Sequence, residues 1–370
     1  MPLSKIITGS LASNVSITTT GNVSANIVSV GTSAVSPVQS FRNKFINGNF
    51  DYWQRQTSNT NVVTGQYVAD RWINVKFGTP TLNISQQSFT TGQTAVPYEP
   101  TFYYRANTVS STGSANGIYV SQRVESVRTL AGQTATLSFY AKADASKNVA
   151  VEFVQNFGTN GSAEANGVNV TTFSLTSSWQ QFKTTVTLPS ISGKTVDSAT
   201  ANYLGVNFWL DAGSTYNTRT NSLGQQSGTF DFSEVQLEAG STATPFEFRP
   251  QQTELALCQR YFVNIVGDSS SVGFRAIGTG YANQTTTDAT IVIPLSVAMR
   301  VTPTVTFSGT LTILDGTASG TVSSIPSLYS SSSSTLWGIF RTGATFTTGR
   351  GAIMYTQNAT TNIFNLSAEL

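Results

Sequence analysis

From residue 41 to about residue 248 the sequence is a series of short runs in which apolar and polar residues alternate, with glycine, asparagine and proline between the runs. Successive side chains of a strand point to opposite faces, so this period of two predicts strands with one buried face. About ten strands with turns at this spacing indicate an antiparallel β-sandwich over residues 41–249. The clearest runs are 67–75, 117–124, 134–142, 149–154, 179–187, 203–210 and 229–237.

The pattern changes after residue 249. Pro250 suits the first turn of a helix, and Cys258, Phe262 and Ile265 follow on one apolar face, which predicts a short linker helix over 250–266. We interpret Cys258 as a small buried hydrophobic residue. Strand-like runs then return and predict a second, smaller C-terminal β-sandwich over 267–370. These runs are 290–295, 303–307, 336–340, 352–355 and 363–366.

Residues 1–40 are rich in serine, threonine, alanine, glycine and asparagine and contain no aromatic residue, so a packed core is not expected there. Two interpretations remain open. The segment is either a disordered leader or an extended arm that pairs with neighbouring subunits or docks on a larger assembly. The first ten residues have no apolar core of a secretory signal. The expected fold class is therefore all-β, with an N-terminal extended arm, a β-sandwich, a short linker helix and a second β-sandwich.

The chain contains no histidine, which removes the usual general base and the usual zinc ligand. Serine–histidine and cysteine–histidine sites and histidine-bound metals are excluded, and the single cysteine cannot form an intrachain disulfide. Only chemistry that needs two carboxylates stays open. Aspartate and glutamate are few and scattered, so we expect no catalytic residues and no enzyme activity.

Charged residues make up 10% of the chain, against a usual share of about 25%. Twenty Lys and Arg against 18 Asp and Glu leave a formal charge of +2, so no nucleic-acid partner is predicted. No apolar run approaches the ~18 residues of a membrane-spanning helix, so membrane insertion is not expected either. A surface made polar by uncharged side chains suits an extracellular particle, and it is equally typical of any all-β protein rich in threonine and serine.

Several motifs occur in a characteristic order. Within the first of them, Asn47-Gly48-Asn49 predicts a turn with a positive φ angle. The series resembles the jelly-roll domains, similar to carbohydrate-binding modules, of bacteriophage tail-fibre and other virion structural proteins, and it covers roughly residues 42–265. The motifs are FINGNFDYWQR (45–55), VADRW (68–72), YVSQRVE (119–125), LAGQTATLSFYAK (130–142), EVQLEAG (234–240), TPFEFRP (244–250) and ELALCQRYF (254–262), with LSAEL at 366–370.

The resemblance implies a virion protein displayed on the particle exterior. The leading hypothesis is a tail-fibre or receptor-binding subunit, a homotrimer that contacts host surface polysaccharide for attachment. Its arm, residues 1–40, would bind other virion proteins. The alternative is a capsid decoration, cement or head-fibre protein that uses the same jelly roll for assembly. A polysaccharide-degrading enzyme is the third hypothesis.

Jelly rolls of this kind often hold a structural calcium between the first and last strands, and no other cofactor is implied. The corresponding acids here are Asp51 and, near the last strand, Asp231 or Glu234. Ser233 stands where a further acid would complete the set, and the other interpretation of these residues is that they are solvated strand acids.

Sugar recognition would use exposed aromatic rings, although most aromatic residues of a sandwich belong to its core. Tyr98 lies between two prolines in the loop 91–100, which makes it the best candidate for an exposed ring. The predicted glycan contacts are Tyr98, Tyr103, Trp179 and Tyr216, and Tyr104 and Trp209 are further candidates.

Overall fold

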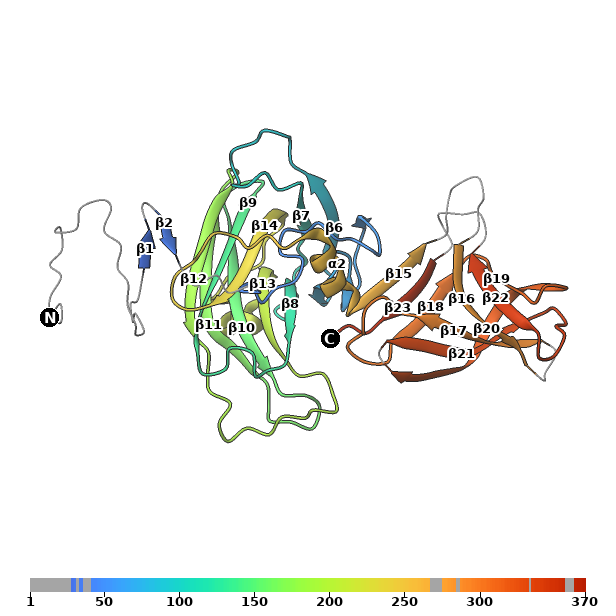
Figure 1. Ribbon diagram of the computed structural model, residues 1–370. Coiled ribbons are helices and arrows are strands. Elements are labelled where there is room, and N and C mark those ends of the chain that lie inside the picture. Colours follow the sequence, from blue (N-terminus) through green and yellow to red (C-terminus); the bar gives the residue numbers. More distant parts are fainter. Residues whose placement is uncertain are drawn as a thin grey trace. The chain divides into compact units, whose positions relative to one another are not determined.

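The computed structural model describes residues 28–30, 33–35, 41–266, 275–283, 287–332, 334–356 and 363–370. The chain divides into two compact units, residues 1–41 and residues 42–370. In the first unit β1 (Val28–Val30) and β2 (Ser33–Val35) pair in an antiparallel hairpin. The rest of the predicted arm lies outside the described residues. Strands dominate the second unit, so the predicted all-β class is confirmed (Figure 1).

The jelly roll consists of two six-stranded antiparallel sheets. We call one the β14 sheet, with the order β12-β9-β14-β7-β6-β3, and the other the β13 sheet, with the order β11-β10-β13-β8-β5-β4. The strands of the β14 sheet are β3 (Ser58–Asn59), β6 (Thr81–Ser88), β7 (Phe102–Val109), β9 (Thr134–Ala143), β12 (Gln180–Thr187) and β14 (Gly228–Ala239). Those of the β13 sheet are β4 (Gln66–Tyr67), β5 (Trp72–Phe77), β8 (Gly117–Glu125), β10 (Lys147–Asn156), β11 (Ala165–Leu175) and β13 (Tyr203–Ala212).

Aromatic side chains from both sheets fill the space between them. Phe139 of β9 meets Phe208 of β13 edge-on, with ring centroids 5.3 Å apart, and Phe208 meets Phe232 of β14 at 5.6 Å. Each of these rings is at most 3% exposed. Burying a side chain of this size stabilises the fold by about 1.5–3 kcal/mol, so the alternation that predicted the strands also supplies the core.

A β-bulge interrupts the central strand β14. Ser233 pairs with Tyr140 of β9 and Gln236 pairs with Ser138, so two residues of β14, Glu234 and Val235, lie opposite one residue of β9. Glu234 has a φ of 48°, in the left-handed region. A bulge of this kind re-aims the side chains around it. The side chain of Val235 therefore points into the core, and the side chain of Glu234 does not.

Beyond the bulge β14 pairs with the entry segment of the jelly roll instead of β7. The Val235 amide donates to the Gly48 carbonyl at 2.8 Å. A Cβ on Gly48 would lie 2.1 Å from the Val235 carbonyl oxygen, so only glycine permits this approach. The turn predicted at 47–49 does contain a positive φ angle, at Asn47 (58°), while Gly48 is needed for the close contact.

The linker helix is shorter than predicted. α2 (Gln251–Gln259) follows Pro250 and ends before the predicted residue 266, and residues 262–266 form β15 (Phe262–Val266). Phe262, Val263 and Ile265 favour an extended strand that pairs with β23 (Ile363–Ser367), and this tertiary pairing overrides the helical spacing. Cys258 is fully buried, as predicted. Within the part of the chain that the structure describes, no helix is long and apolar enough to cross a membrane.

The C-terminal β-domain contains a three-stranded sheet, β15-β23-β18, and a six-stranded closed barrel, β16-β17-β21-β20-β19-β22. The second β-domain expected from the sequence is thus present, but its larger sheet closes on itself and leaves no edge strand. The strands not yet given are β16 (Arg275–Ala282), β17 (Asp288–Pro294), β18 (Thr304–Ser308), β19 (Leu311–Leu314), β20 (Ser319–Ser332), β21 (Thr335–Thr342) and β22 (Gly351–Thr356).

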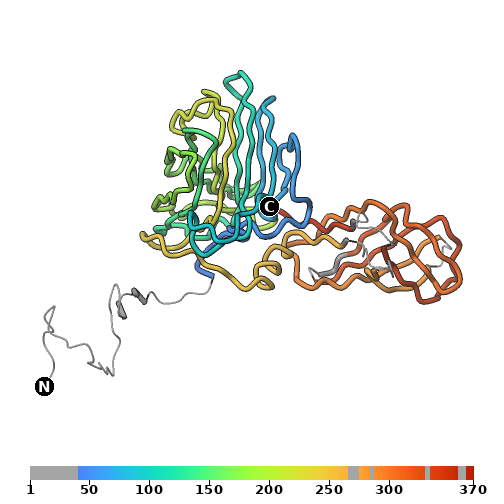
Figure 2. Tube along the Cα trace, turned by 90° about the horizontal axis from the view of Figure 1, so that it is seen from above, coloured from blue at the N-terminus to red at the C-terminus, as the bar shows by residue number. Residues whose placement is uncertain are grey.

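The segment after β23 returns to the jelly roll, where the red trace meets the blue and cyan strands (Figure 2). Arg71, which is 1% exposed, forms an ion pair with Glu369, and its guanidinium lies 3.5 Å from the centroid of the Tyr261 ring. Tyr67 and Arg123 donate to the Leu370 carbonyl oxygen at 2.7 and 2.6 Å. We call this set of contacts the tail clamp.

We expect Arg71→Ala to destabilise the protein by about 3 kcal/mol, because it leaves the buried Glu369 carboxylate without its closest cation. Denaturant unfolding followed by tryptophan fluorescence measures the change. Arg128→Ala removes an exposed arginine of the same domain and should alter stability by less than about 0.5 kcal/mol. Identical unfolding curves for the two variants would contradict the tail clamp.

Candidate functional site

The outer face of the β14 sheet carries a row of charged side chains across its central strands. Asp231 of β14 lies in register with Lys142 of β9 and Arg105 of β7. The Arg105 guanidinium donates to both Asp231 oxygens at 2.7 and 2.8 Å, and Lys142 Nζ lies 3.7 Å from one of them. The Asp231 carboxylate is therefore compensated by cations within the protein.

An aromatic cluster lies beside this row. It consists of Phe89, Tyr103 and Trp179, whose ring centroids are 4.8 to 5.3 Å apart and whose side chains are half-buried. Phe89 follows β6, Tyr103 belongs to β7 and Trp179 precedes β12, so the sheet brings together residues that are distant in the sequence. Lys142 Nζ lies 5.2 Å from the centroid of the Trp179 ring, which joins the cluster to the charged row.

A cavity of about 270 Å³ opens on the same face. Tyr140 lies two residues before Lys142 on β9, on the same side of the sheet, and Gln181 of β12 lies opposite Tyr140. The cavity thus borders the charged row along β9. The side chains that line it include Tyr98, Ser138, Tyr140, Gln181, Glu234 and Phe246.

Glu234 supplies the carboxyl group of this cavity. The bulge in β14 brings its side chain out of the core, yet it remains only 3% exposed. Its Oε1 atom accepts no hydrogen bond from the described part of the protein. Burial disfavours the ionised form and raises the pKa of Glu234 to about 8. This carboxyl group is therefore both buried and incompletely satisfied.

Tyr98 stands at the rim of the cavity in the loop between β6 and β7. The loop is held by its own hydrogen bonds, since the Gln93 side chain accepts from the Val96 amide at 2.9 Å and donates to the Val96 carbonyl at 2.8 Å. Tyr98 itself is 58% exposed, and its ring meets Phe248 edge-on at 5.7 Å. The best exposed candidate of the sequence is thus indeed exposed.

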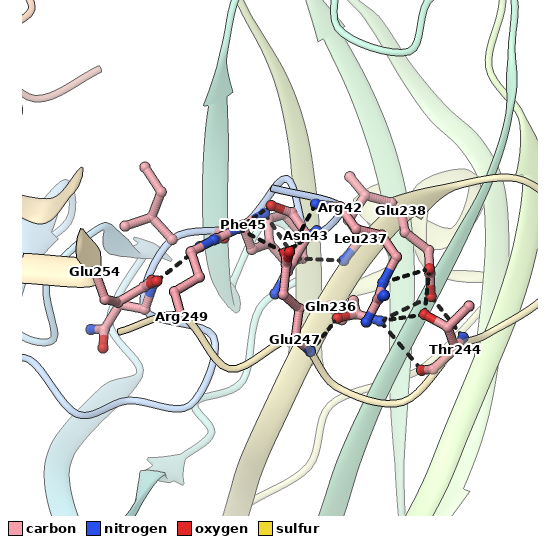
Figure 3. Close-up of polar contacts among 12 residues, drawn as sticks. Arg42, Asn43, Phe45, Gln236, Leu237, Glu238, Thr244, Glu247, Arg249 and Glu254 are labelled. Atoms are coloured by element: carbon pink, nitrogen blue, oxygen red, sulfur yellow. Dashed lines mark hydrogen bonds and ion pairs between the residues drawn. The ribbon is translucent and has the colours of Figure 1, made fainter. Parts of the chain in front are cut away.

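A polar network anchors the opposite wall, the segment 243–246 (Figure 3). Glu238 accepts hydrogen bonds from the Thr244 amide at 2.8 Å and the Thr244 hydroxyl at 2.6 Å. The Glu247 amide donates to Gln236 at 2.8 Å, and the Glu247 carboxylate accepts from the Asn43 amide at 2.8 Å. The wall is therefore tied both to β14 and to the entry segment.

The structure brings three of the four favoured glycan contacts to this face: Tyr98, Tyr103 and Trp179. Tyr216 lies elsewhere, against the outer side of the β13 sheet, where its ring meets Trp209 at 4.9 Å and Phe77 at 5.1 Å. Its packing role explains its partial burial. The further candidates Tyr104 and Trp209 are fully buried, so they cannot contact a ligand.

The three acids suggested for calcium do not form one site. Asp231 is bound by Arg105, and Glu234 lines the cavity. Asp51 lies beside a different cavity of about 20 Å³, room for about one water molecule, and burial raises its pKa to about 6. No group of three acidic or cysteine side chains in the described ranges could hold a metal ion. The calcium hypothesis thus has no support from this arrangement.

Other residues of the face were not singled out from the sequence. Arg105, Lys142, Tyr140 and Gln181 stand at outward positions of ordinary alternating strands, and the sequence contains no signal that separates them from solvated positions. Glu234 was suggested from the sequence only as a calcium ligand, but the sequence does contain a signal for its position in the bulge. The apolar alternation of β14 skips one position between Phe232 and Val235, which marks the bulge.

Comparisons with known proteins find fold likeness only. No protein-family model matches the sequence, and no curated protein matches it. A CBM4 structure shares 20% identity over 52% of this chain and 98% of its own, with a TM-score of 0.31. The family 11 carbohydrate-binding module of Clostridium thermocellum, in complex with a β-1,3-1,4-mixed-linked tetrasaccharide, shares 11% over 51% and 99% (TM-score 0.31).

The enzymatically active domain of tailspike protein 4 of bacteriophage CBA120 shares 10% identity over 54% of this chain and 22% of its own, with a TM-score of 0.32. At such identities and TM-scores these likenesses carry no argument about ligand or activity.

The Glu234 carboxyl group predicts a specific pH dependence of stability. The pKa of Glu234 is about 8 in the folded chain against 4.5 for an ordinary glutamate. The folded chain therefore loses stability as pH rises from about 4.5 to about 8, because the unfolded chain ionises this group more readily. Glu234→Gln, which stays neutral, should match the unmodified chain near pH 4.5 and exceed its stability by several kcal/mol above pH 8, since each unit of pKa corresponds to about 1.4 kcal/mol. Thermal unfolding across this range tests it, with the exposed Glu164→Gln as control. A stability difference between Glu234→Gln and the unmodified chain that did not change with pH would contradict this prediction.

Proposed function

We propose that the outer face of the β14 sheet binds carbohydrate on a host cell surface, and that the chain is a non-catalytic structural subunit of a bacteriophage virion. One observation carries the binding proposal. The half-buried cluster of Phe89, Tyr103 and Trp179 stands beside charged and amide side chains and beside a cavity with an unsatisfied carboxyl group.

This combination matches the chemistry of a sugar. The C–H faces of a pyranose ring pack against aromatic rings, and its hydroxyl groups exchange hydrogen bonds with charged and amide side chains. Trp179 and Tyr103 offer ring surface, and Arg105, Lys142 and Gln181 offer polar partners on the same face. Sites that bind small ligands are largely preformed. Because these residues stand on or next to strands of one sheet, their positions are fixed before a ligand binds.

The arrangement of acids supports a binding role over hydrolysis. Glycoside hydrolysis uses one carboxylic acid as proton donor and one carboxylate as base or nucleophile. Near the aromatic cluster, Asp231 is occupied by Arg105 and Lys142. Among the described residues that line the cavity, Glu234 is therefore the single acid.

The virion role rests on the ordered motifs of residues 42–265. We infer a tail-fibre or receptor-binding subunit that assembles as a homotrimer and attaches to other virion proteins through residues 1–40. Three copies would present three sugar-binding faces, and multivalency raises the avidity of weak single sites by orders of magnitude.

Replacing Trp179 tests the binding face. Trp179→Ala removes the largest ring of the aromatic cluster and should weaken binding to the host's surface polysaccharide by about 10- to 100-fold, which corresponds to 1.4–2.8 kcal/mol. Calorimetric titration measures it. Tyr281→Ala, which removes an exposed aromatic residue of the barrel, is the control and should leave the affinity unchanged. Unaltered binding by Trp179→Ala would refute the face as the site.

A tail-fibre subunit should be trimeric and should block phage adsorption, and both properties can be measured. Native mass spectrometry should give a trimer, and purified protein should compete with phage for adsorption to host cells, while Trp179→Ala should compete poorly. If saturating protein left adsorption unchanged and a C-terminal label lay over the capsid, the tail-fibre role would be wrong and the decoration role would replace it.

A further inference from the structure

The Glu234 cavity has an unusual charge balance. Among the described residues that line it, one has a carboxyl group and none is a lysine or arginine. The nearest cations along β9 and β7, Lys142 and Arg105, already bracket Asp231. On the other wall, Arg42 lies 3.3 Å from Glu238. These three cations are thus engaged with other acids. Lys183 of β12, exposed and in register with Ser138 of the lining, forms no ion pair with Glu234 among the described residues, and Glu234 keeps an oxygen without a partner.

A buried carboxyl group with an unpartnered oxygen favours one kind of ligand group over others. A hydroxyl group can pair with the neutral form of the carboxyl group, which burial favours, but only a cation stabilises the ionised form, and an anionic group adds repulsion. An ammonium group satisfies both the hydrogen-bonding capacity and the charge, because a charge-assisted hydrogen bond is about twice as strong as a neutral one.

The remaining lining also suits a cation. Tyr98, Tyr140 and Phe246 line the cavity, and the faces of aromatic rings attract a desolvated ammonium group. Ser138 and Gln181 supply further hydrogen-bonding groups. The volume of about 270 Å³ is near the lower end of small-molecule sites, which start at about 300 Å³. It suits one sugar residue rather than an oligosaccharide.

We propose that the Glu234 cavity binds the free ammonium group of an amino sugar within the glycan. The inference rests on the proposed function and adds to it a ligand class. Trp179 and Tyr103 hold the chain of sugars on the sheet face, while Glu234 selects the residue that carries an amine. N-acetylated and carboxylated sugars are disfavoured at this position, since neither brings a positive charge to the carboxylate.

Matched saccharides test the selection. The full chain is titrated calorimetrically with the β-1,4-linked tetramer of glucosamine and with the tetramer of N-acetylglucosamine, which differ in the charge and acetylation of the amine. We expect the glucosamine tetramer to bind at least tenfold more tightly. Glu234→Gln should reduce this preference to twofold or less. Glu164→Gln, which removes an exposed carboxylate elsewhere, should keep the preference and shows that general attraction of a polycation is not its cause.

The outcomes separate this inference from the proposed function. A preference that survives Glu234→Gln, or no preference in the unmodified chain, overturns the inference alone if the host polysaccharide still binds through Trp179. A host polysaccharide that binds this face but carries no amine also overturns it. If neither tetramer binds, chemical N-acetylation of the host polysaccharide must weaken its binding at least tenfold, and unchanged affinity rejects the inference. Absence of any polysaccharide binding rejects the proposed function itself.

Discussion

The bulge in β14 is the constraint on which the jelly roll and its outer face depend. β14 is a central strand, and its inward residues Phe230, Phe232, Val235 and Leu237 keep the core continuous only because one extra residue is accommodated between them. Without the bulge, Glu234 would take the inward position after Phe232, where an unpaired carboxyl group costs several kcal/mol. One local irregularity therefore preserves the core, directs β14 to the entry segment and places a carboxyl group in the cavity.

Elsewhere this chain of few charges satisfies its buried acids in pairs and networks. Glu152 of β10, fully buried on the outer side of the β13 sheet, accepts hydrogen bonds from Trp209 at 2.9 Å and from Arg219 at 2.5 Å. Glu369 is held by Arg71 in the tail clamp. Removing one partner of such a pair destabilises a protein strongly. Among the buried acids of the described ranges Asp211 also has an unpartnered oxygen, Oδ2, but its Oδ1 accepts hydrogen bonds from Ser110 and Gln226. Glu234 has no such compensation, and this contrast is the reason to assign it a ligand rather than a structural role.

Strands rich in apolar residues were predicted from the sequence, whereas more polar strands such as β6 and β7 were not, although their buried positions alternate. β9 and β13 were predicted to within two residues because each buries its inward side chains. β11 escaped prediction since it lies at a sheet edge with most positions half-buried or exposed, so no face is consistently apolar. The helical spacing that extended the predicted linker to residue 266 gave way to pairing between β15 and β23, about one hundred residues apart.

By itself the sequence determined the all-β class, the absence of histidine chemistry and the exposure of Tyr98 between two prolines. These follow from local periodicity and residue chemistry. Only the tertiary structure decided that Tyr103, Trp179 and Tyr98 share one face while Tyr216 lies against the other sheet, and that the C-terminal strands close into a barrel. Such outcomes depend on which strands become neighbours, and alternation specifies the face of a side chain within its strand but not the strand beside it.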